Sequence, residues 1–229
     1  MRRIDMTRAF LCSILLLLTT AGWAAEQKHI RYVALGDSYT IGTGALPSQS
    51  WPVVVTDRLQ DEGIDIELVE NLAHNGFTTE DLIENELPAL EDLKPDLVTL
   101  LIGANDWGRG VDAQTFGRRF HTILDRLMAV MHDPKRILVI TIPDFSKTST
   151  GKEYLQGMFL TKNRSLKEFN RLIIKEAKAR GVAVVDLYPL SQEQAKDDSL
   201  TSPDGLHPSA RGYAQWATLI KPAVKAAVE

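Results

Sequence analysis

Cysteine is almost absent from this chain of 229 residues, which contains Cys12 and no other. Cys12 lies near the start of an apolar run, whereas a lipoprotein carries its acylated cysteine at the end of its leader. A lone cysteine cannot form an intramolecular disulfide or a thiolate cluster. We therefore expect no lipid anchor, no disulfide scaffold and no cysteine-ligated metal. We also expect no cysteine catalysis, because Cys12 lies within residues 1–24, which resemble a leader that is removed.

The chain also lacks an excess of positive charge. Its 26 lysines and arginines are outnumbered by 30 aspartates and glutamates, and the formal net charge is −4. Nucleic-acid binding leaves a basic patch, and electrostatic attachment to a membrane needs a run of basic residues. The charge balance therefore argues against a nucleic-acid partner and against a polybasic membrane tether.

Motifs for metals and nucleotides are missing as well. The sequence has no His-Glu-x-x-His pair, no cluster of carboxylates and no glycine-rich phosphate loop followed by Gly-Lys-Ser/Thr. Gly42 and Gly44 do not have the spacing of a dinucleotide-binding fingerprint. We expect neither a metal nor any other cofactor.

The N-terminal segment resembles an export signal. Residues 2–8 carry three arginines, an apolar run follows at 9–18, and residues 21–25 are mostly small. This layout predicts a cleaved secretory signal peptide at 1–24, a single domain at 25–229, and a periplasmic or secreted protein. A retained membrane anchor is the less favoured alternative, because the apolar run is shorter than the ~20 residues that span a bilayer.

Beyond residue 30, short aliphatic runs alternate with longer amphipathic stretches. The runs predict five strands, at 31–35, 66–71, 96–102, 136–142 and 181–187. The stretches predict helices at 51–60, 79–92, 113–131, 162–180 and 209–228. This alternation predicts a three-layer α/β/α sandwich with a five-stranded parallel sheet. Ligands of such sheets bind beyond the carboxyl ends of the strands, so residues just after strands are the candidates for chemistry.

The first such segment is Gly36-Asp-Ser-Tyr39. A serine at a strand-to-helix turn can present its hydroxyl at the edge of the sheet, and N–H groups at a helix start favour an oxyanion. Ser38 is therefore a candidate nucleophile. Aspartate and serine are also common helix caps, so this motif alone does not decide between catalysis and capping.

Two further segments carry candidate hydrogen-bond donors. Gly76 follows the second strand and can offer its N–H to a developing negative charge, and Asn105 follows the third strand and can offer its side-chain amide. A plain turn glycine and an Asx turn are the alternatives.

The last segment, Ser202-Pro-Asp-Gly-Leu-His-Pro208, precedes the final helix. An aspartate and a histidine three residues apart in a turn can face each other, with the carboxylate accepting from Nδ1–H and Nε2 left to take a serine proton. Asp204 and His207 are therefore candidates for the rest of a triad. A surface histidine beside a Pro-Asp-Gly turn is the alternative.

Together, these four segments resemble the SGNH (GDSL) hydrolase family, over essentially all of the chain after residue 24. The resemblance implies a flavodoxin-like SGNH fold with Ser38 as nucleophile, His207 as base and Asp204 as its partner. It also implies an oxyanion hole made by Ser38, Gly76 and Asn105. The stretch 103–110 (GANDWGRG) is most similar to the thioesterase/lysophospholipase branch.

We expect substrate contacts from residues inside or beside these motifs: Asp37, Tyr39, His74 and Trp107. Tyr39 departs from the family pattern, which has leucine at that position. Segment 143–161 is long and becomes apolar toward its end, so it is either a flap over the pocket or a surface loop that packs its own aromatic residue.

The resemblance implies an exported serine esterase acting on a small-molecule, lipid or glycan ester, such as a lipase, lysophospholipase or thioesterase. A carbohydrate deacetylase is the main alternative within the same chemistry. From a different class, an inactive exported binding module would keep the fold without reacting at Ser38.

Overall fold

The computed structural model describes residues 28–157 and 165–229. The expected signal peptide at 1–24, the end of segment 143–161 and the start of the helix predicted at 162–180 lie outside these ranges. Within the described part of the chain, no helix combines the length and the hydrophobicity that crossing a bilayer requires.

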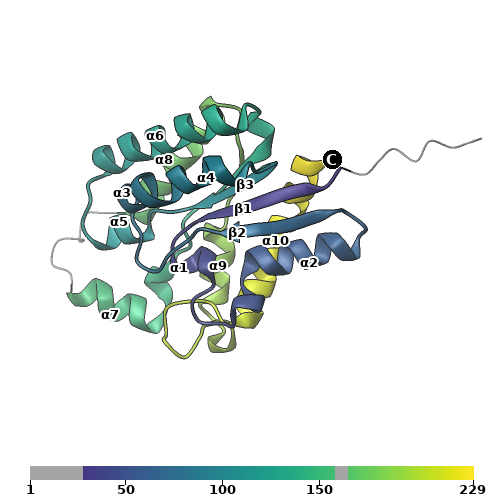
Figure 1. Ribbon diagram of the computed structural model, residues 1–229. Helices are drawn as coiled ribbons and strands as arrows, with labels where there is room; N and C mark the ends of the chain where they lie inside the picture. The colour runs from purple at the N-terminus through teal and green to yellow at the C-terminus, as the bar shows by residue number, and fades with distance from the viewer. Residues whose placement is uncertain (1–27, 158–164) are drawn as a thin grey trace, which may run out of the picture.

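The centre of the molecule is the predicted five-stranded parallel sheet, with strand order β2-β1-β3-β4-β5 (Figure 1). The strands are β1 (Ile30–Gly36), β2 (Ile66–Asn71), β3 (Leu97–Leu101), β4 (Ile137–Ile140) and β5 (Ala183–Val185). Gly36 pairs with Leu101, so β1 and β3 end level with each other. The chain order reverses between these two strands, and open α/β sheets bind ligands at such a point.

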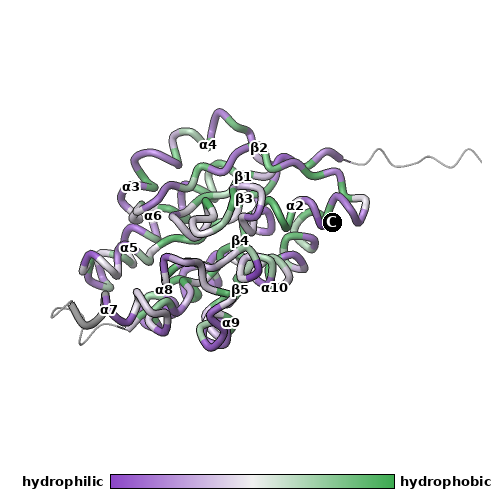
Figure 2. The backbone as a smooth tube through the Cα atoms, turned by 90° about the horizontal axis from the view of Figure 1, so that it is seen from below, coloured by the Kyte–Doolittle hydropathy of each residue, from purple (hydrophilic) through white to green (hydrophobic). Residues whose placement is uncertain are grey.

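Helices cover both faces of this sheet, which confirms the three-layer prediction (Figure 1). On one face lie α3 (Thr79–Asp81), α4 (Leu87–Leu93), α5 (Ala104–Gly108), α6 (Ala113–Met131) and α8 (Leu166–Ala179). On the other lie α1 (Ser38–Ile41), α2 (Trp51–Asp61), α9 (Tyr188–Gln194) and α10 (Ala210–Val228). Hydrophobic residues follow the strands through the interior, whereas the outer turns of the helices are mostly hydrophilic (Figure 2).

The strands form because their aliphatic side chains are buried from both sides; all five residues of β3 and all four of β4 are inaccessible. On the face covered by α6 and α8, the ring of Phe116 stacks on Phe120 and Phe169, with centroids 5.8 and 4.2 Å apart. The bounds predicted for the helix at 113–131 are those observed.

The single helix predicted at 79–92 is interrupted. Thr78 caps its start, and a π-helical turn, η2 (Leu82–Glu86), separates α3 from α4. The N–H of Leu87 donates to the carbonyl of Leu82 across this widened turn. Pro88 follows at once, and because proline cannot donate a backbone hydrogen bond, the regular ladder is broken near this point in any case.

Several short elements were not predicted. They are the helices α1, α5, α7 (Ser149–Gly157) and α9, and the 3₁₀ turns η1 (Pro47–Gln49), η3 (Pro134–Arg136), η4 (Phe145–Lys147) and η5 (Asp198–Leu200). Of these, α1 and α5 directly follow β1 and β3 and therefore carry residues of the predicted site.

Candidate active site

Ser38 is the first residue of α1, directly after the end of β1. The turn depends on Gly36, which has φ of +151°; a Cβ there would lie 2.2 Å from the carbonyl oxygen of Leu101. Asp37 caps the helix by accepting a hydrogen bond from the N–H of Tyr39. As the first helical residue, Ser38 has a backbone N–H with no partner in the helix, and its hydroxyl lies at the edge of the sheet.

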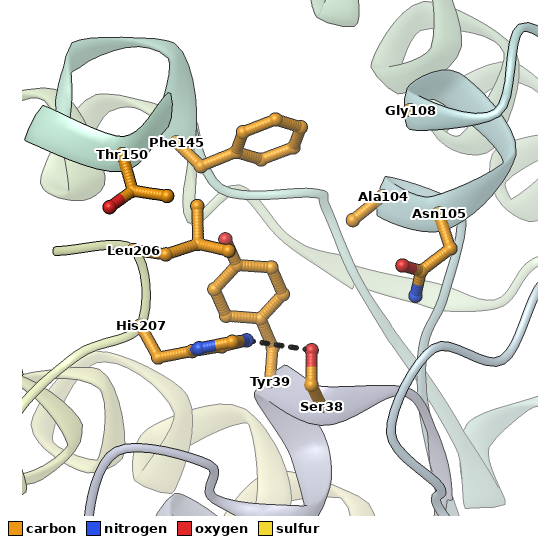
Figure 3. Close-up of a pocket in the computed structure, with 9 residues that line it drawn as sticks. All are labelled: Ser38, Tyr39, Ala104, Asn105, Gly108, Phe145, Thr150, Leu206 and His207. Atoms are coloured by element: carbon orange, nitrogen blue, oxygen red, sulfur yellow. Dashed lines mark hydrogen bonds between the residues drawn. The ribbon is translucent and has the colours of Figure 1, made fainter. Parts of the chain in front are cut away.

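His207 reaches Ser38 from the other end of the chain. Its Nε2 lies 2.9 Å from the Ser38 Oγ, and its Nδ1 lies 2.7 Å from an Asp204 carboxylate oxygen. Figure 3 shows the imidazole and the hydroxyl facing each other across the pocket. The three side chains thus form one continuous chain of hydrogen bonds, the arrangement that lets an imidazole take a serine proton.

The Asp204 carboxylate is held in its charged form. Burial alone would raise its pKa, but hydrogen bonds from the Ser202 hydroxyl, the His207 imidazole and the N–H groups of His207 and Leu206 outweigh that effect. The pKa of Asp204 is consequently lowered to about 2. An ionised carboxylate can accept from Nδ1–H and so hold Nε2 as the proton acceptor.

The loop that carries Asp204 and His207 is tied at both ends and along its length. The N–H of Ser202 donates to the carbonyl of His207 at 2.8 Å. From α7, the hydroxyl and the N–H of Thr150 donate to the carbonyls of Asp204 and Gly205, at 2.7 and 2.9 Å. The position of the imidazole is therefore coupled to the first turn of α7.

Gly76 lies on the loop after β2 and Asn105 lies in the first turn of α5, and a hydrogen bond joins these two segments. The side-chain amide of Asn105 donates to the carbonyl of Phe77 at 2.9 Å, which uses one of its two hydrogens. Gly76 adopts φ of +81°, a conformation that favours glycine. Its N–H donates to no acceptor in residues 28–157 and 165–229. Both residues thus retain an N–H that is free to bind an oxyanion.

Arg109 fixes this part of the site. Its guanidinium donates to the carbonyl of Gly76 at 2.7 Å and lies 3.7 Å from the Asp81 carboxylate. The sequence analysis did not single out Arg109, although it belongs to the stretch 103–110 that carries the family resemblance. Its role depends on a contact with a loop 33 residues away, which the sequence alone does not reveal.

A pocket of about 160 Å³ opens beside the Ser38 hydroxyl (Figure 3). We call it the active-site pocket, and it is lined by Ser38, Tyr39, Ala104, Asn105, Gly108, Phe145, Thr150, Leu206 and His207. Phe145 and Thr150 come from segment 143–161, whose described part is η4 and α7. The lining is apolar apart from Ser38, His207, Asn105 and Thr150, so the pocket suits a hydrocarbon group.

Of the four expected substrate contacts, only Tyr39 lines the pocket. Asp37 is fully buried, because its carboxylate is used as a helix cap. Trp107 is 2% exposed and packs edge-on against Phe145 behind the pocket wall. His74 is exposed, bonds to the Leu72 carbonyl and stacks on Phe77, away from the pocket lining. The structure therefore places Asp37, His74 and Trp107 outside the lining of the active-site pocket, contrary to the expectation that they contact substrate directly.

Two buried acidic side chains, Asp37 and Glu86, contact the backbone where β1 ends and α1 begins. Burial raises the pKa of Asp37 to about 7, against the opposing effect of the Tyr39 N–H. Burial likewise raises the pKa of Glu86 to about 9, although Glu86 accepts a hydrogen bond from the Gly36 N–H. Glu86 was not predicted. The sequence could have indicated its burial, because Glu86 is four residues from both Leu82 and Leu90, a spacing that places it on the buried face of the predicted helix.

No group of three histidine, cysteine, aspartate or glutamate side chains is arranged to hold a metal ion in the described ranges. The groups gathered around Ser38 are instead those of acyl transfer: a hydroxyl, an imidazole with its carboxylate, and N–H donors.

A family model described as GDSL-like lipase/acylhydrolase matches residues 34–215 of the chain. The chain belongs to this family. The matched span contains Ser38, Gly76, Asn105, Asp204 and His207. The resemblance seen in the sequence is thereby confirmed at the level of the family.

Two curated relatives of this GDSL family member are esterases. An arylesterase from Vibrio mimicus is 34% identical over 87 residues, which cover 38% of this chain and 43% of that protein. The esterase TesA from Pseudomonas aeruginosa is 35% identical over 100 residues, which cover 44% and 47% of the two chains. The match thus spans less than half the length of each of these two relatives.

The fold is also that of a solved family structure. A crystal structure of TesA matches with a TM-score of 0.69 and 24% identity, and the match covers 86% of this chain and 99% of that one. The likeness establishes the shared architecture.

Proposed function

We propose that this family member is a serine esterase that hydrolyses carboxylic esters through an acyl-enzyme. The observation that carries the proposal is the unbroken hydrogen-bonded line from Ser38 through His207 to Asp204, with separations of 2.9 and 2.7 Å. These distances lie within the range over which a general base takes a proton from its nucleophile.

In the first step, His207 Nε2 removes the hydroxyl proton as the Ser38 Oγ attacks the ester carbonyl. The carbonyl oxygen gains negative charge, which the N–H groups of Ser38, Gly76 and Asn105 stabilise. Asp204 keeps the imidazole in the correct tautomer and stabilises its positive charge. His207 then gives its proton to the departing alcohol oxygen, which leaves Ser38 acylated.

In the second step, His207 removes a proton from water, and the resulting hydroxide equivalent attacks the acyl carbon. The same N–H donors stabilise the second oxyanion. Collapse of this intermediate breaks the bond to Ser38 Oγ, which recovers its proton from His207 and releases the carboxylic acid. Every proton transfer in the cycle is made by chain residues.

The test is Ser38→Ala, assayed on p-nitrophenyl butyrate, with Ser48→Ala as a matched control on the exposed turn η1. Ser38→Ala should lose hydrolysis and labelling by a fluorophosphonate while keeping the wild-type circular dichroism spectrum. Ser48→Ala should behave as wild type. Full activity in Ser38→Ala would end the esterase proposal, and a wild-type chain that neither reacts nor labels would favour a binding module.

Within this chemistry, we favour esters with an aliphatic group over acetylated sugars. Ala104, Gly108, Phe145 and Leu206 present hydrocarbon to the active-site pocket, whereas a sugar needs several polar partners. A panel of aliphatic p-nitrophenyl esters and acetylated xylan separates the two classes. Higher kcat/KM on acetylated xylan would favour the carbohydrate deacetylase.

We also propose that residues 1–24 are removed during export and that 25–229 form the working domain. The basic start, the apolar run and the small residues near position 24 support this proposal. Expression of the full chain in a Gram-negative host, followed by fractionation and intact-mass measurement, tests it. Recovery of the uncleaved chain in the cytoplasm would contradict it.

A further inference from the structure

The ring of Tyr39 lies between the active-site pocket and a second space, which we call the rear cavity. The rear cavity has a volume of about 30 Å³ and shares Tyr39, Phe145 and Leu206 with the lining of the active-site pocket. Its other side is closed by residues of α9, α10 and η5 and of the loop that follows β4, including Asp144, Gln194 and Trp216. Removal of the Tyr39 ring would join the two spaces.

The ring is held in place by packing. Tyr39 is 3% exposed, and its ring centroid lies 5.1 Å from that of His207, 5.8 Å from that of Trp216 and 6.4 Å from that of Phe145. Figure 3 shows the ring extending from beside Ser38 toward Leu206. Close packing on all these sides prevents the ring from moving aside for a ligand without a change in the neighbouring side chains.

The hydroxyl of Tyr39 is not what holds the ring. It is buried and has no hydrogen-bond partner among the described residues. The rear cavity is large enough for one water molecule and has polar groups in its lining, including those of Asp144 and Gln194. A leucine at this position, as the family pattern has, would present neither the ring nor the hydroxyl.

We propose that Tyr39 is a specificity-determining residue that limits the length of the aliphatic group accepted by the active-site pocket. The inference rests on the proposed esterase function and assigns this residue a role in choosing the ester. An aliphatic chain lying along Phe145 and Leu206 meets the Tyr39 ring, whereas in a Tyr39→Leu variant it can continue into the rear cavity.

The test compares wild type with Tyr39→Leu on two series of esters. In one, the acyl group of a p-nitrophenyl ester grows from acetyl to dodecanoyl; in the other, the alcohol of an alkyl acetate grows over the same range. In Tyr39→Leu, the ratio of kcat/KM for the eight-carbon over the four-carbon member should rise at least tenfold in one of the series. Rates are normalised to the number of Ser38 sites labelled by a fluorophosphonate, so that partial misfolding does not affect the ratio.

Two variants sharpen the interpretation. Tyr39→Phe keeps the ring and should keep the wild-type ratio. Tyr188→Leu makes the same change on α9, outside both spaces, and should also keep it. If too little of the Tyr39→Leu variant folds to be labelled, Tyr39→Met is used instead, because methionine is flexible and unbranched and adapts to its surroundings. The same rise in the ratio of kcat/KM is expected for it.

Unchanged ratios in both series, in a variant whose Ser38 is labelled normally, would overturn the role of Tyr39 and leave the esterase function intact. Absence of labelling and hydrolysis in wild type would instead remove the esterase function itself.

Discussion

The carboxyl group of Glu86 bonds directly to the last residue of β1: its Oε2 accepts a hydrogen bond from the N–H of Gly36 at 2.9 Å. Glu86 belongs to the π-helical turn η2 and is 1% exposed, and its other oxygen has no partner among the described residues. π-Turns of this kind occur often at functional sites. Here the turn places the buried Glu86 carboxyl group against Gly36, which lies two residues before Ser38 in the chain.

The first prediction concerns the pH dependence of stability. The folded-state pKa of Glu86, about 9, is above its ordinary value of 4.5, so the folded chain binds this proton more tightly than the unfolded chain does. The resulting stabilisation is complete below about pH 4.5 and is lost as pH rises through 9. Between pH 5 and 9.5, Tm should therefore fall more in wild type than in Glu86→Gln, by roughly 3 °C or more, the change that about 1 kcal/mol produces at this size.

Thermal unfolding followed by circular dichroism measures this difference, with Glu84→Gln as the control on the exposed side of the same turn. Asp37 titrates in the same direction in all three proteins, and its charge is one of the causes that raise the pKa of Glu86. If Tm falls with pH equally in wild type and in Glu86→Gln, Glu86 is charged in the folded state.

The second prediction concerns Asp204. Asp204→Asn should lower kcat by about 10⁴, because an amide that donates to Nδ1 holds the imidazole in the wrong tautomer. The fold should survive, since the loop keeps its ties from Thr150 and from the Ser202 N–H. Steady-state kinetics on p-nitrophenyl butyrate measure the loss. Activity within tenfold of wild type would show that the carboxylate does not set the tautomer.

The third prediction concerns Asn105. Asn105→Ala should lower kcat by about 10²–10³ with little change in KM, because its contact with the oxygen strengthens as charge develops there. Asn85→Ala is the matched control, since Asn85 is exposed and bonds only to the Asp81 carbonyl in the described structure. A change confined to KM in Asn105→Ala would assign the amide to ground-state binding.

The fourth prediction concerns Arg109, which positions Gly76 without touching the pocket. Arg109→Met should reduce kcat by about threefold to tenfold, the effect of losing one charge-assisted hydrogen bond at a partly exposed site. Arg109→Lys should recover part of the loss because it retains a donor. Arg118→Met, an exposed change on α6, is the control. If Arg109→Lys and Arg109→Met are equally impaired with unchanged Tm, the hydrogen bond to Gly76 is not the cause.

The sequence predicted the layers and the five strands, and it singled out three side chains that the fold brings into hydrogen-bond contact, because each has a local signature. Strand β4 is a continuous aliphatic run and β3 is one apart from Thr99, and Ser38, Asp204 and His207 lie in short motifs beside predicted elements. The walls of the pocket have no such signature. Phe145, Thr150 and Leu206 meet only when loops 50 or more residues apart fold together, as the bond between Thr150 and the Asp204 carbonyl shows.

The expectations that changed did so for identifiable physical reasons. Asp37 looks available in the motif, but the first turn of α1 needs its carboxylate as a cap. The helix predicted at 79–92 has helical spacing of its apolar residues on both sides of η2. The extra residue in the π-turn, however, cannot be predicted from such a periodic pattern. Trp107 is drawn behind Phe145 by aromatic packing that no local pattern specifies.

The hydrogen bonds from Thr150 to the carbonyls of Asp204 and Gly205 couple α7 to the loop that carries His207. A displacement of the first turn of α7 by about an ångström would move these two backbone carbonyls and, with them, the His207 imidazole. The distance between the imidazole and the Ser38 hydroxyl would change as a result. Insertions or deletions near this turn would therefore alter turnover even where they leave every pocket-lining residue unchanged.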